Sequence, residues 1–272
     1  MKLLDLFSGI GGFHLGLEQS GFEFDWIGYS EIDKYASKQY KRRFPNATEL
    51  GDVTTIQPKD LPTDITILCG GFPCQAFSIA GKRQGFNDTR GTLFFEIARI
   101  LRYFKDIGKP IPYFVLENVK GLLNHDNGRT FATIYGVLSN FDYTIECQLL
   151  NTKWWLPQNR ERIYIVGHLG GRGRPKIFPV TENDIRNRKK YIQKIWKSSK
   201  EKQDMQYFMR RRRCSKYRRL TPVECERLQG FPDGWTKGQS DTQRYKQLGN
   251  AVSVPVVKAV GDKIWRLTQK NI

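Results

Sequence analysis

One cysteine in the sequence stands where it would act as a nucleophile. Residues 70–78 read GGFPCQAFS and follow residues 64–69 (DITILC), an apolar run typical of a buried strand. Pro73 stiffens the turn and places Cys74 at the edge of the predicted sheet. Near a helix start and basic groups, the pKa of such a thiol falls and the thiolate becomes reactive. Cys74 is therefore the candidate nucleophile.

Three further side chains at strand boundaries suit a polar ring or an anion. Glu117 follows the apolar run YFVL, where a partly apolar setting raises a carboxyl pKa and lets the acid hydrogen-bond a ring nitrogen. The alternative is a structural acid at a strand end. Arg160 and Arg162 enter the run RIYIV and project to one face of an extended chain. There they are suited to hold a carbonyl oxygen or a phosphate.

A glycine-rich turn and two acids indicate an adenosyl cofactor. Residues 5–13 read DLFSGIGGF, which allows close backbone approach to a ligand but lacks the GxGxxG spacing of dinucleotide-binding turns. Glu31 ends the second predicted strand, where a carboxylate accepts hydrogen bonds from ribose hydroxyls. Asp52 offers another carboxylate for an adenine amino group. The alternative is a set of tight turns with exposed acids.

These residues must be positioned by alternating strands and helices. Such alternation predicts an α/β fold with a mainly parallel sheet covered on both faces, which binds ligands at the carboxyl ends of its strands. The predicted strands are residues 2–7, 24–30, 64–69, 113–116, 143–150 and 162–166, and the predicted helices are residues 13–19, 35–44 and 92–104.

The character of the sequence changes after Gly170. GGRGRP and a basic, weakly periodic stretch indicate a linker and a small separate unit. A capping box, TPVE, starts a helix at Thr221. Residues 252–267 are apolar at helical spacing and are expected to pack back onto the large core. We therefore predict one domain from residues 1–167 and 245–272, and a small basic region at residues 168–244.

Positive charge is concentrated in one part of the chain. The net charge is +18, and residues 168–219 contain 18 Lys and Arg against four Asp and Glu, an excess of 14. Such a concentration favours a nucleic-acid partner over a merely solvated basic segment.

Cysteine usage and hydropathy exclude several classes. The five cysteines form no CxxC pair and their number is odd, so a disulfide framework or a metal site is not expected. Cys69, Cys147 and Cys225 lie in apolar patterns and are expected to be inert core residues. The sequence has no apolar run long enough for a membrane span and no signal-peptide layout. We therefore expect a cytoplasmic protein.

The motifs together, and in this order, resemble the cytosine-C5 DNA methyltransferase family. The resemblance rests on DLFSGIGGF, the acid Glu31, GGFPCQAFS, ENV, QNRERIYIVG, RLTPVECERLQGFPD and QLGNAV. It covers nearly the whole chain apart from about residues 168–217. It implies the Rossmann-like sheet of an S-adenosylmethionine-dependent methyltransferase, with a small, reduced target-recognition unit. It also implies a prokaryotic or phage-like protein that is nucleoid-associated when bound to DNA.

The resemblance implies roles for the candidate residues. Cys74 would attack carbon 6 of a cytosine rotated out of duplex DNA. Glu117 would hydrogen-bond ring nitrogen 3 and the amino group, Arg162 would hold the carbonyl oxygen, and Arg160 would support these groups. Cofactor contacts are expected from Phe7, Gly9, Gly11, Glu31, Ile32, Asp52, Asn250 and Val252, and DNA contacts from Ser78, Arg83, Gln84, Arg210, Arg211, Arg212 and Arg213.

The recognition region departs from the family pattern because it is short and poor in core-forming residues. Its arginine run is better suited to phosphates than to base edges. The chain is thus expected to read a very short sequence, to depend on a second specificity-giving chain, or to be a non-catalytic nucleic-acid-binding relative. A cognate restriction endonuclease is a further possible partner, in a restriction-modification system. The same chemistry on RNA (tRNA) is the alternative substrate.

Overall fold

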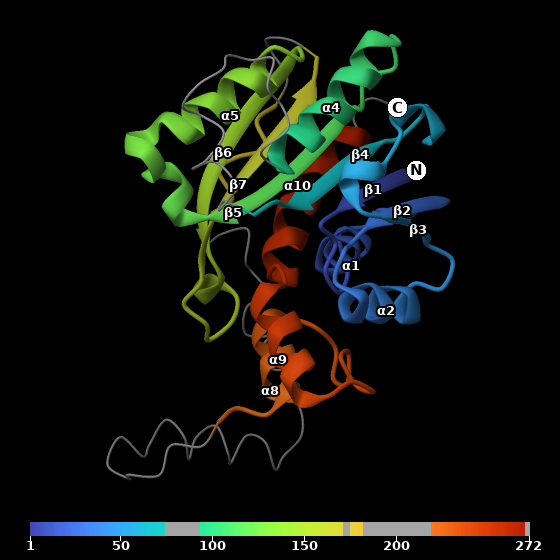
Figure 1. The fold of residues 1–272 in the computed structure, drawn as a ribbon. Coiled ribbons are helices and arrows are strands. Elements are labelled where there is room, and N and C mark those ends of the chain that lie inside the picture. Colours follow the sequence, from blue (N-terminus) through green and yellow to red (C-terminus); the bar gives the residue numbers. More distant parts are fainter. Residues whose placement is uncertain (74–92, 171–174, 182–218, 270–272) are drawn as a thin grey trace.

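The centre of the molecule is a seven-stranded sheet (Figure 1). The computed structural model describes residues 1–73, 93–170, 175–181 and 219–269. The strands are β1 (Lys2–Leu6), β2 (Trp26–Ser30), β3 (Thr48–Gly51), β4 (Ile67–Gly71), β5 (Tyr113–Val119), β6 (Tyr143–Asn151) and β7 (Glu161–Leu169). The α-helices are α1 (Gly12–Gln19), α2 (Lys34–Arg43), α4 (Leu93–Asp106), α5 (Arg129–Ser139), α8 (Pro222–Gln229), α9 (Asp241–Asn250) and α10 (Val254–Gln269).

The sheet order is β3-β2-β1-β4-β5-β7-β6, and the α/β prediction is confirmed. The first five of these strands pair in parallel, whereas β7 is antiparallel to both β5 and β6. Residues 152–160 between β6 and β7 are too few for a crossover helix, so the two strands form an antiparallel pair. The sheet is therefore mixed at one side.

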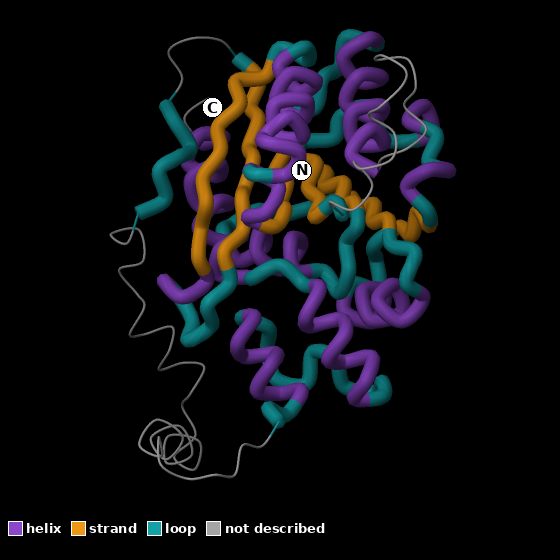
Figure 2. Tube along the Cα trace, turned by 60° about the vertical axis from the view of Figure 1, so that its left-hand side comes forward, coloured by secondary structure: helices purple, strands orange, loops and turns teal. Residues whose placement is uncertain are grey.

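Helices cover both faces of the sheet, as Figure 2 shows. On one face, α4 and α5 bury Phe94, Ile97 and Ile134 against alternate residues of β1, β4 and β5. On the other face, α1 and α10 bury Leu17 and Val260 with the remaining strand residues. The expected packing of the C-terminal helix onto the large core is thus confirmed. Both layers leave the carboxyl ends of the parallel strands free to form a site.

The segment before the C-terminal helix forms a small helical unit below the sheet in both views (Figures 1 and 2). The Thr221 side chain accepts a hydrogen bond from the Glu224 backbone N–H, and the Glu224 carboxylate accepts from the Thr221 backbone N–H. The predicted capping box is confirmed. Phe231 and Leu248 share a small core with Ile10 of the glycine-rich turn.

Some elements and one cysteine differ from the sequence prediction. The strand β3 and the helices α5 and α9 were not predicted, because β3 is largely exposed and α9 buries only Gln247 and Leu248. Cys69 is buried as expected. The prediction for Cys147 is wrong, because its side chain on the edge strand β6 is exposed, and Cys225 is only partly buried.

A buried acid lies beneath the glycine-rich turn. Asp5 on β1 is fully buried, and its two oxygens lie 3.3 Å from Tyr40 Oη and 3.3 Å from Cys69 Sγ. Tyr40 Oη is in turn 3.0 Å from His14 Nδ1. Burial raises the pKa of Asp5 to about 8, and the nearby charge of Glu31 adds to that rise against the two hydrogen bonds. Asp5 is therefore a neutral acid at neutral pH.

Replacing Asp5 with asparagine should remove a pH dependence of stability. Because the pKa in the folded state, about 8, is above the ordinary value of 3.8, the favourable contribution of Asp5 is complete below pH 4. It is lost as the pH rises from about 4 through 8, by an amount on the order of 6 kcal/mol. The free energy of unfolding in urea should be measured from pH 5 to 9. As the pH rises, the free energy of Asp5→Asn should increase relative to that of the unchanged protein. For Asp60→Asn, at an exposed position, the difference from the unchanged protein should be the same at every pH. Parallel curves for Asp5→Asn would contradict the buried neutral acid.

Candidate active site

A buried acid and a guanidinium meet where β5 and β7 lie side by side. Glu117 is 8% exposed, and its Oε1 atom is 3.1 Å from Arg162 Nε. Oε1 has no hydrogen-bond partner within the residues that the structure describes. Burial raises the pKa of Glu117, although the positive charges of Arg162 and Arg160 oppose the rise. The pair thus presents a buried acid with an unsatisfied oxygen, beside a fixed cation.

The direction of β7 brings Arg162 to this place. Ligands of such sheets bind at the carboxyl ends of the parallel strands. Because β7 is antiparallel, its first residues, and not its last, lie at that edge: Arg162 is opposite Val119, and Tyr164 is opposite Glu117.

Arg160 has a different role from Arg162. Its two terminal nitrogens donate to the backbone carbonyls of Gly249 and Ala251, each at 3.0 Å. Gly249 lies in the last turn of α9, and Ala251 directly follows that helix. Burial lowers the pKa of Arg160, and the charge of Arg162 lowers it further. Arg160 therefore ties the end of α9 to the start of β7, while its neighbour faces Glu117.

Asn118 connects this acid to the turn that leads into the candidate nucleophile. Asn118 Nδ2 donates to the carbonyl oxygen of Phe72 at 2.9 Å. In the sheet, Gly71 is opposite Glu117, so the described chain reaches Pro73 beside the acid. Cys74 follows directly but lies outside the described residues. The sequence analysis did not single out Asn118, although its position in ENV was the available signal.

The glycine-rich turn adopts a strained backbone at the end of β1. Phe7, Gly9 and Gly11 have φ angles of 54°, 55° and 83°. A positive φ at a residue other than glycine costs free energy and is found where the surroundings fix it. The Gly9 N–H donates to Glu31 Oε2 at 2.8 Å, and the Glu31 Oε1 atom accepts from the Asp33 N–H at 2.8 Å. Glu31 thus links the first turn to the end of β2.

Two further candidate cofactor residues lie just beyond the ends of β2 and β3, as Glu31 does. Ile32 follows it, and its apolar side chain is 74% exposed. Asp52 follows β3 and caps a short 3-10 helix, Val53–Thr55, by accepting from the Thr54 N–H at 2.9 Å. An exposed aliphatic residue next to a carboxylate is the arrangement that a flat heteroaromatic ring requires.

The remaining two candidates come from the C-terminal part of the chain. Asn250 is exposed at the end of α9. Val252 is 8% exposed and packs so closely on Gly12 that an added Cβ there would be 2.7 Å from its Cγ2 atom. Its Cγ1 atom would be 3.9 Å from a Cβ on Gly71. Val252 therefore lies between the glycine-rich turn and the turn that leads to Cys74.

The residues at this edge fit an adenosyl ligand. Among the residues that the structure describes, a Cβ on Gly9 would meet no atom within 4 Å, so these residues leave open space over the turn. The buried hydroxyls Ser8 Oγ and Ser253 Oγ have no hydrogen-bond partner within the described residues. Open backbone, unpaired hydroxyls, Glu31 and exposed Ile32 together offer both the polar and the apolar contacts of such a ligand.

The predicted DNA contacts cannot be placed in the same way. Ser78, Arg83, Gln84, Arg210, Arg211, Arg212 and Arg213 lie outside the described residues. In the ranges that are described, no group of His, Cys, Asp and Glu has metal-ligand geometry. Within the same ranges, no helix has the length and hydropathy to cross a membrane.

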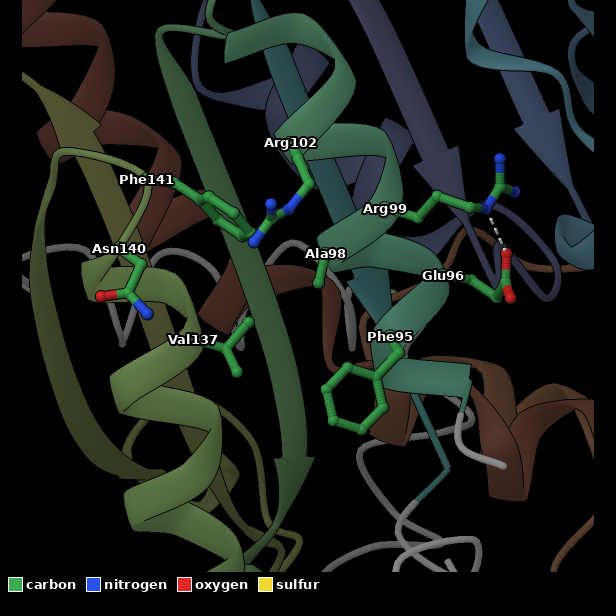
Figure 3. Close-up of a pocket in the computed structure, with 8 residues that line it drawn as sticks. All are labelled: Phe95, Glu96, Ala98, Arg99, Arg102, Val137, Asn140 and Phe141. Atoms are coloured by element: carbon green, nitrogen blue, oxygen red, sulfur yellow. Dashed lines mark hydrogen bonds and ion pairs between the residues drawn. The ribbon is translucent and has the colours of Figure 1, made fainter. Parts of the chain in front are cut away.

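A separate cavity of about 240 Å³ lies between α4 and the end of α5 (Figure 3). Arg102 lies over the Phe141 ring, with its guanidinium carbon 5.8 Å from the ring centroid, and Arg99 turns away to pair with Glu96. None of the candidate site residues lines this cavity. It is therefore distinct from the edge that carries Glu117.

The fold is the Rossmann-like α/β sheet of S-adenosylmethionine-dependent methyltransferases. The crystal structure of the Dnmt2 methyltransferase of S. pombe matches 100% of this chain and 99% of its own, with a TM-score of 0.71 and 22% sequence identity. A likeness at this identity supports the fold.

The comparisons of sequence then give the family. A family model described as C-5 cytosine-specific DNA methylase matches residues 1–213 and 188–266. The Type II methyltransferase M1.ScrFI of Lactococcus lactis subsp. cremoris is 39% identical over an alignment that covers 99% of this chain and 79% of that protein. The orphan methyltransferase M.Rho11sI of Bacillus phage rho11s is 49% identical over 61% of this chain and 33% of that protein. The chain belongs to the C-5 cytosine-specific DNA methylase family, and it is an enzyme that methylates carbon 5 of cytosine in DNA.

Proposed function

We propose that this methylase attacks a cytosine rotated out of duplex DNA with Cys74, while Glu117 and Arg162 hold the base. The observation that carries the proposal is the buried Glu117 oxygen, which has no hydrogen-bond partner within the described part of the chain and lies beside Arg162 and the turn that leads to Cys74. A base in the stack cannot offer carbons 5 and 6 to a nucleophile, so the cytosine must leave the helix.

The residues of the chain carry out the covalent steps. The Cys74 thiolate adds to carbon 6, and the electron pair of the 5,6 double bond makes carbon 5 nucleophilic. Neutral Glu117 donates to ring nitrogen 3 and stabilises the electron-rich ring, while Arg162 holds the carbonyl oxygen. After carbon 5 has gained its methyl group, it gives its proton to water, and the electron pair of that bond forms the 5,6 double bond again while the bond from carbon 6 to the Cys74 sulfur breaks. This step restores the aromatic ring and the Cys74 thiolate.

S-adenosylmethionine, when bound, supplies an electrophilic methyl group on a sulfonium sulfur. We propose that it is held by the glycine-rich turn and by the neighbouring strand ends. The Gly9 backbone and Glu31 are suited to its polar groups, Ile32 to one face of its adenine ring, and Asp52 to the adenine amino group. The other proposed contacts are Phe7, Gly11, Asn250 and Val252.

Covalent trapping tests this proposal most directly. In a duplex that contains 5-fluorocytosine at the target, fluorine replaces the proton that carbon 5 must lose before Cys74 is released. The protein should therefore remain covalently bound to the DNA in the presence of S-adenosylmethionine. Denaturing electrophoresis should show the covalent product with duplex DNA. In a separate assay, much less methyl group should be transferred to tRNA than to duplex DNA. If no joined product forms on DNA that the enzyme methylates, the covalent mechanism is wrong.

The basic segment at residues 168–219 is proposed to bind DNA phosphates. Its excess of 14 positive charges should release many counterions on binding. We expect the affinity for duplex DNA to fall about a thousandfold or more between 50 and 200 mM salt. Fluorescence anisotropy with a labelled duplex measures this dependence. A nearly flat response would remove the segment from the DNA interface.

We further propose that residues 1–167 and 245–272 form the catalytic domain, and that residues 168–244 recognise the target. A cognate restriction endonuclease or a second specificity-giving chain remains part of this proposal. Methylation-sensitive sequencing of DNA from cells that express this chain alone tests whether a second chain is needed for recognition of the target. Methylation at one defined motif would show that no second chain is needed.

A further inference from the structure

The middle of the glycine-rich turn is held by a residue far away in the sequence. The indole nitrogen of Trp235 donates to the carbonyl oxygen of Ile10 at 3.0 Å, and both residues are buried. Ile10 lies between Gly9 and Gly11, whose φ angles are positive, and follows Phe7, which has the same strained backbone. Such a turn keeps its shape only if the surrounding contacts fix it. The Trp235 hydrogen bond is one of those contacts.

Trp235 is itself fixed by the helix α2. The Arg43 guanidinium lies over the indole ring, 4.7 Å from its centroid, and Arg43 Nε donates to the Trp235 carbonyl at 2.8 Å. The side-chain amide of Gln39 donates to the same carbonyl. Phe231 packs on the ring with a centroid distance of 5.3 Å. The indole therefore has little freedom to turn away from Ile10.

A buried carboxylate holds the backbone on both sides of Trp235. Glu226 on α8 is completely buried, and it accepts hydrogen bonds from the Gly234 N–H at 2.6 Å and from the Thr236 N–H at 2.8 Å. Arg244 Nη2 lies 3.3 Å from the same carboxylate. Because α8 follows the basic segment at residues 168–219, these contacts join the end of that segment to the turn at Ile10.

We infer that Trp235 is a positioning residue for binding of the methyl donor. Its N–H fixes the Ile10 carbonyl, and thereby the orientation of the Gly9 and Gly11 backbone that faces the ligand. The inference rests on the proposed function, because it takes S-adenosylmethionine as the ligand of this turn. It assigns to the small helical unit a part in cofactor binding as well as in carrying the recognition region.

The test compares Trp235→Phe with Trp265→Phe. Phenylalanine keeps an aromatic ring at position 235 but removes the indole N–H. Trp265 on α10 packs on Phe22, with a centroid distance of 5.1 Å, away from the turn. By calorimetry, the dissociation constant of S-adenosylmethionine should rise about tenfold in Trp235→Phe and stay within about twofold in Trp265→Phe. KM for the donor should rise by a similar factor, with kcat and KM for DNA little changed.

A second pair of variants leaves Trp235 in place. Arg43→Gln removes the guanidinium from the indole and from the Trp235 carbonyl, whereas Arg42 on the same helix donates to the Lys237 carbonyl instead. We expect about a threefold weaker affinity for the donor in Arg43→Gln and no change in Arg42→Gln. Equal affinities in all four variants would overturn the inference.

Hydrogen exchange separates this inference from the proposed function. In the protein without ligand, the amides of residues 8–11 should exchange faster in Trp235→Phe than in Trp265→Phe, whatever the turn binds. Unchanged exchange would show that Trp235 only fills space. If instead the unchanged protein fails to bind S-adenosylmethionine while exchange responds as expected, the proposed ligand is wrong and the positioning role stands.

Discussion

Replacing Cys74 with alanine should lower methyl transfer to DNA by about ten thousandfold or more, because the attack on carbon 6 then has no nucleophile. Transfer of the labelled methyl group from S-adenosylmethionine to a duplex measures the loss. The same variant should form no covalent product with a duplex that contains 5-fluorocytosine. Its affinity for ordinary duplex DNA should change by no more than about threefold, because one small side chain contributes little to phosphate binding.

The matched control is Cys147→Ala. Cys147 is exposed on the edge strand β6, so its removal deletes a thiol without disturbing the core. This variant should retain full transfer and full trapping. Equal activity of Cys74→Ala and the unchanged protein would assign the nucleophile to another residue.

Replacing Glu117 with glutamine should have the second largest effect. We expect kcat to fall by about a hundredfold to a thousandfold, because the amide cannot give up a proton to ring nitrogen 3. The pH profile should change as well. Since burial raises the pKa of Glu117, the neutral donor persists above the ordinary range of a carboxyl group and is lost as the pH rises through the raised pKa. The unchanged enzyme should therefore lose activity on the alkaline side, and Glu117→Gln should lack that loss.

Glu23→Gln serves as the control for this substitution. Glu23 is exposed at the start of the segment before β2, far from the carboxyl ends of the strands. Its rate and pH profile should match those of the unchanged enzyme, measured as kcat under saturating DNA and S-adenosylmethionine. A full-rate Glu117→Gln, or one with the original alkaline loss, would show that Glu117 is not the donor.

Much of the fold was predictable because periodicity and turn residues agree along the first half of the chain. The strands β4 and β5 begin with continuous apolar runs at residues 67–69 and 113–116, as buried parallel strands do, and Gly70 follows the first of these runs. The helix α5 could have been found from its buried residues, Ile134, Val137 and Leu138, which have helical spacing. The reversed β7 could also have been found, from the short connection before it.

Parts of the site depend on contacts that no local pattern encodes. Arg160 and Arg162 look equivalent in the sequence, but one binds the carbonyls of Gly249 and Ala251 and the other faces Glu117. Trp235 is 225 positions from Ile10. Such partners are decided by how distant elements pack, and sequence periodicity carries no information about that choice.

The chain is secured on both sides of residues 182–218. Before them, Gln148 on β6 binds the backbone of Val180 through both its oxygen and its nitrogen, at 2.8 and 2.9 Å, and Ile177 is buried in the large core. After them, Tyr245 donates to the Leu220 carbonyl, and the Arg219 guanidinium lies 3.6 Å from the centroid of the Tyr245 ring. The contacts before and after residues 182–218 are both made with helices and strands that the structure describes. A segment of different length could therefore connect the same two points. Under the proposal that residues 168–244 recognise the target, exchange of that segment would change the target sequence and leave the described scaffold unchanged.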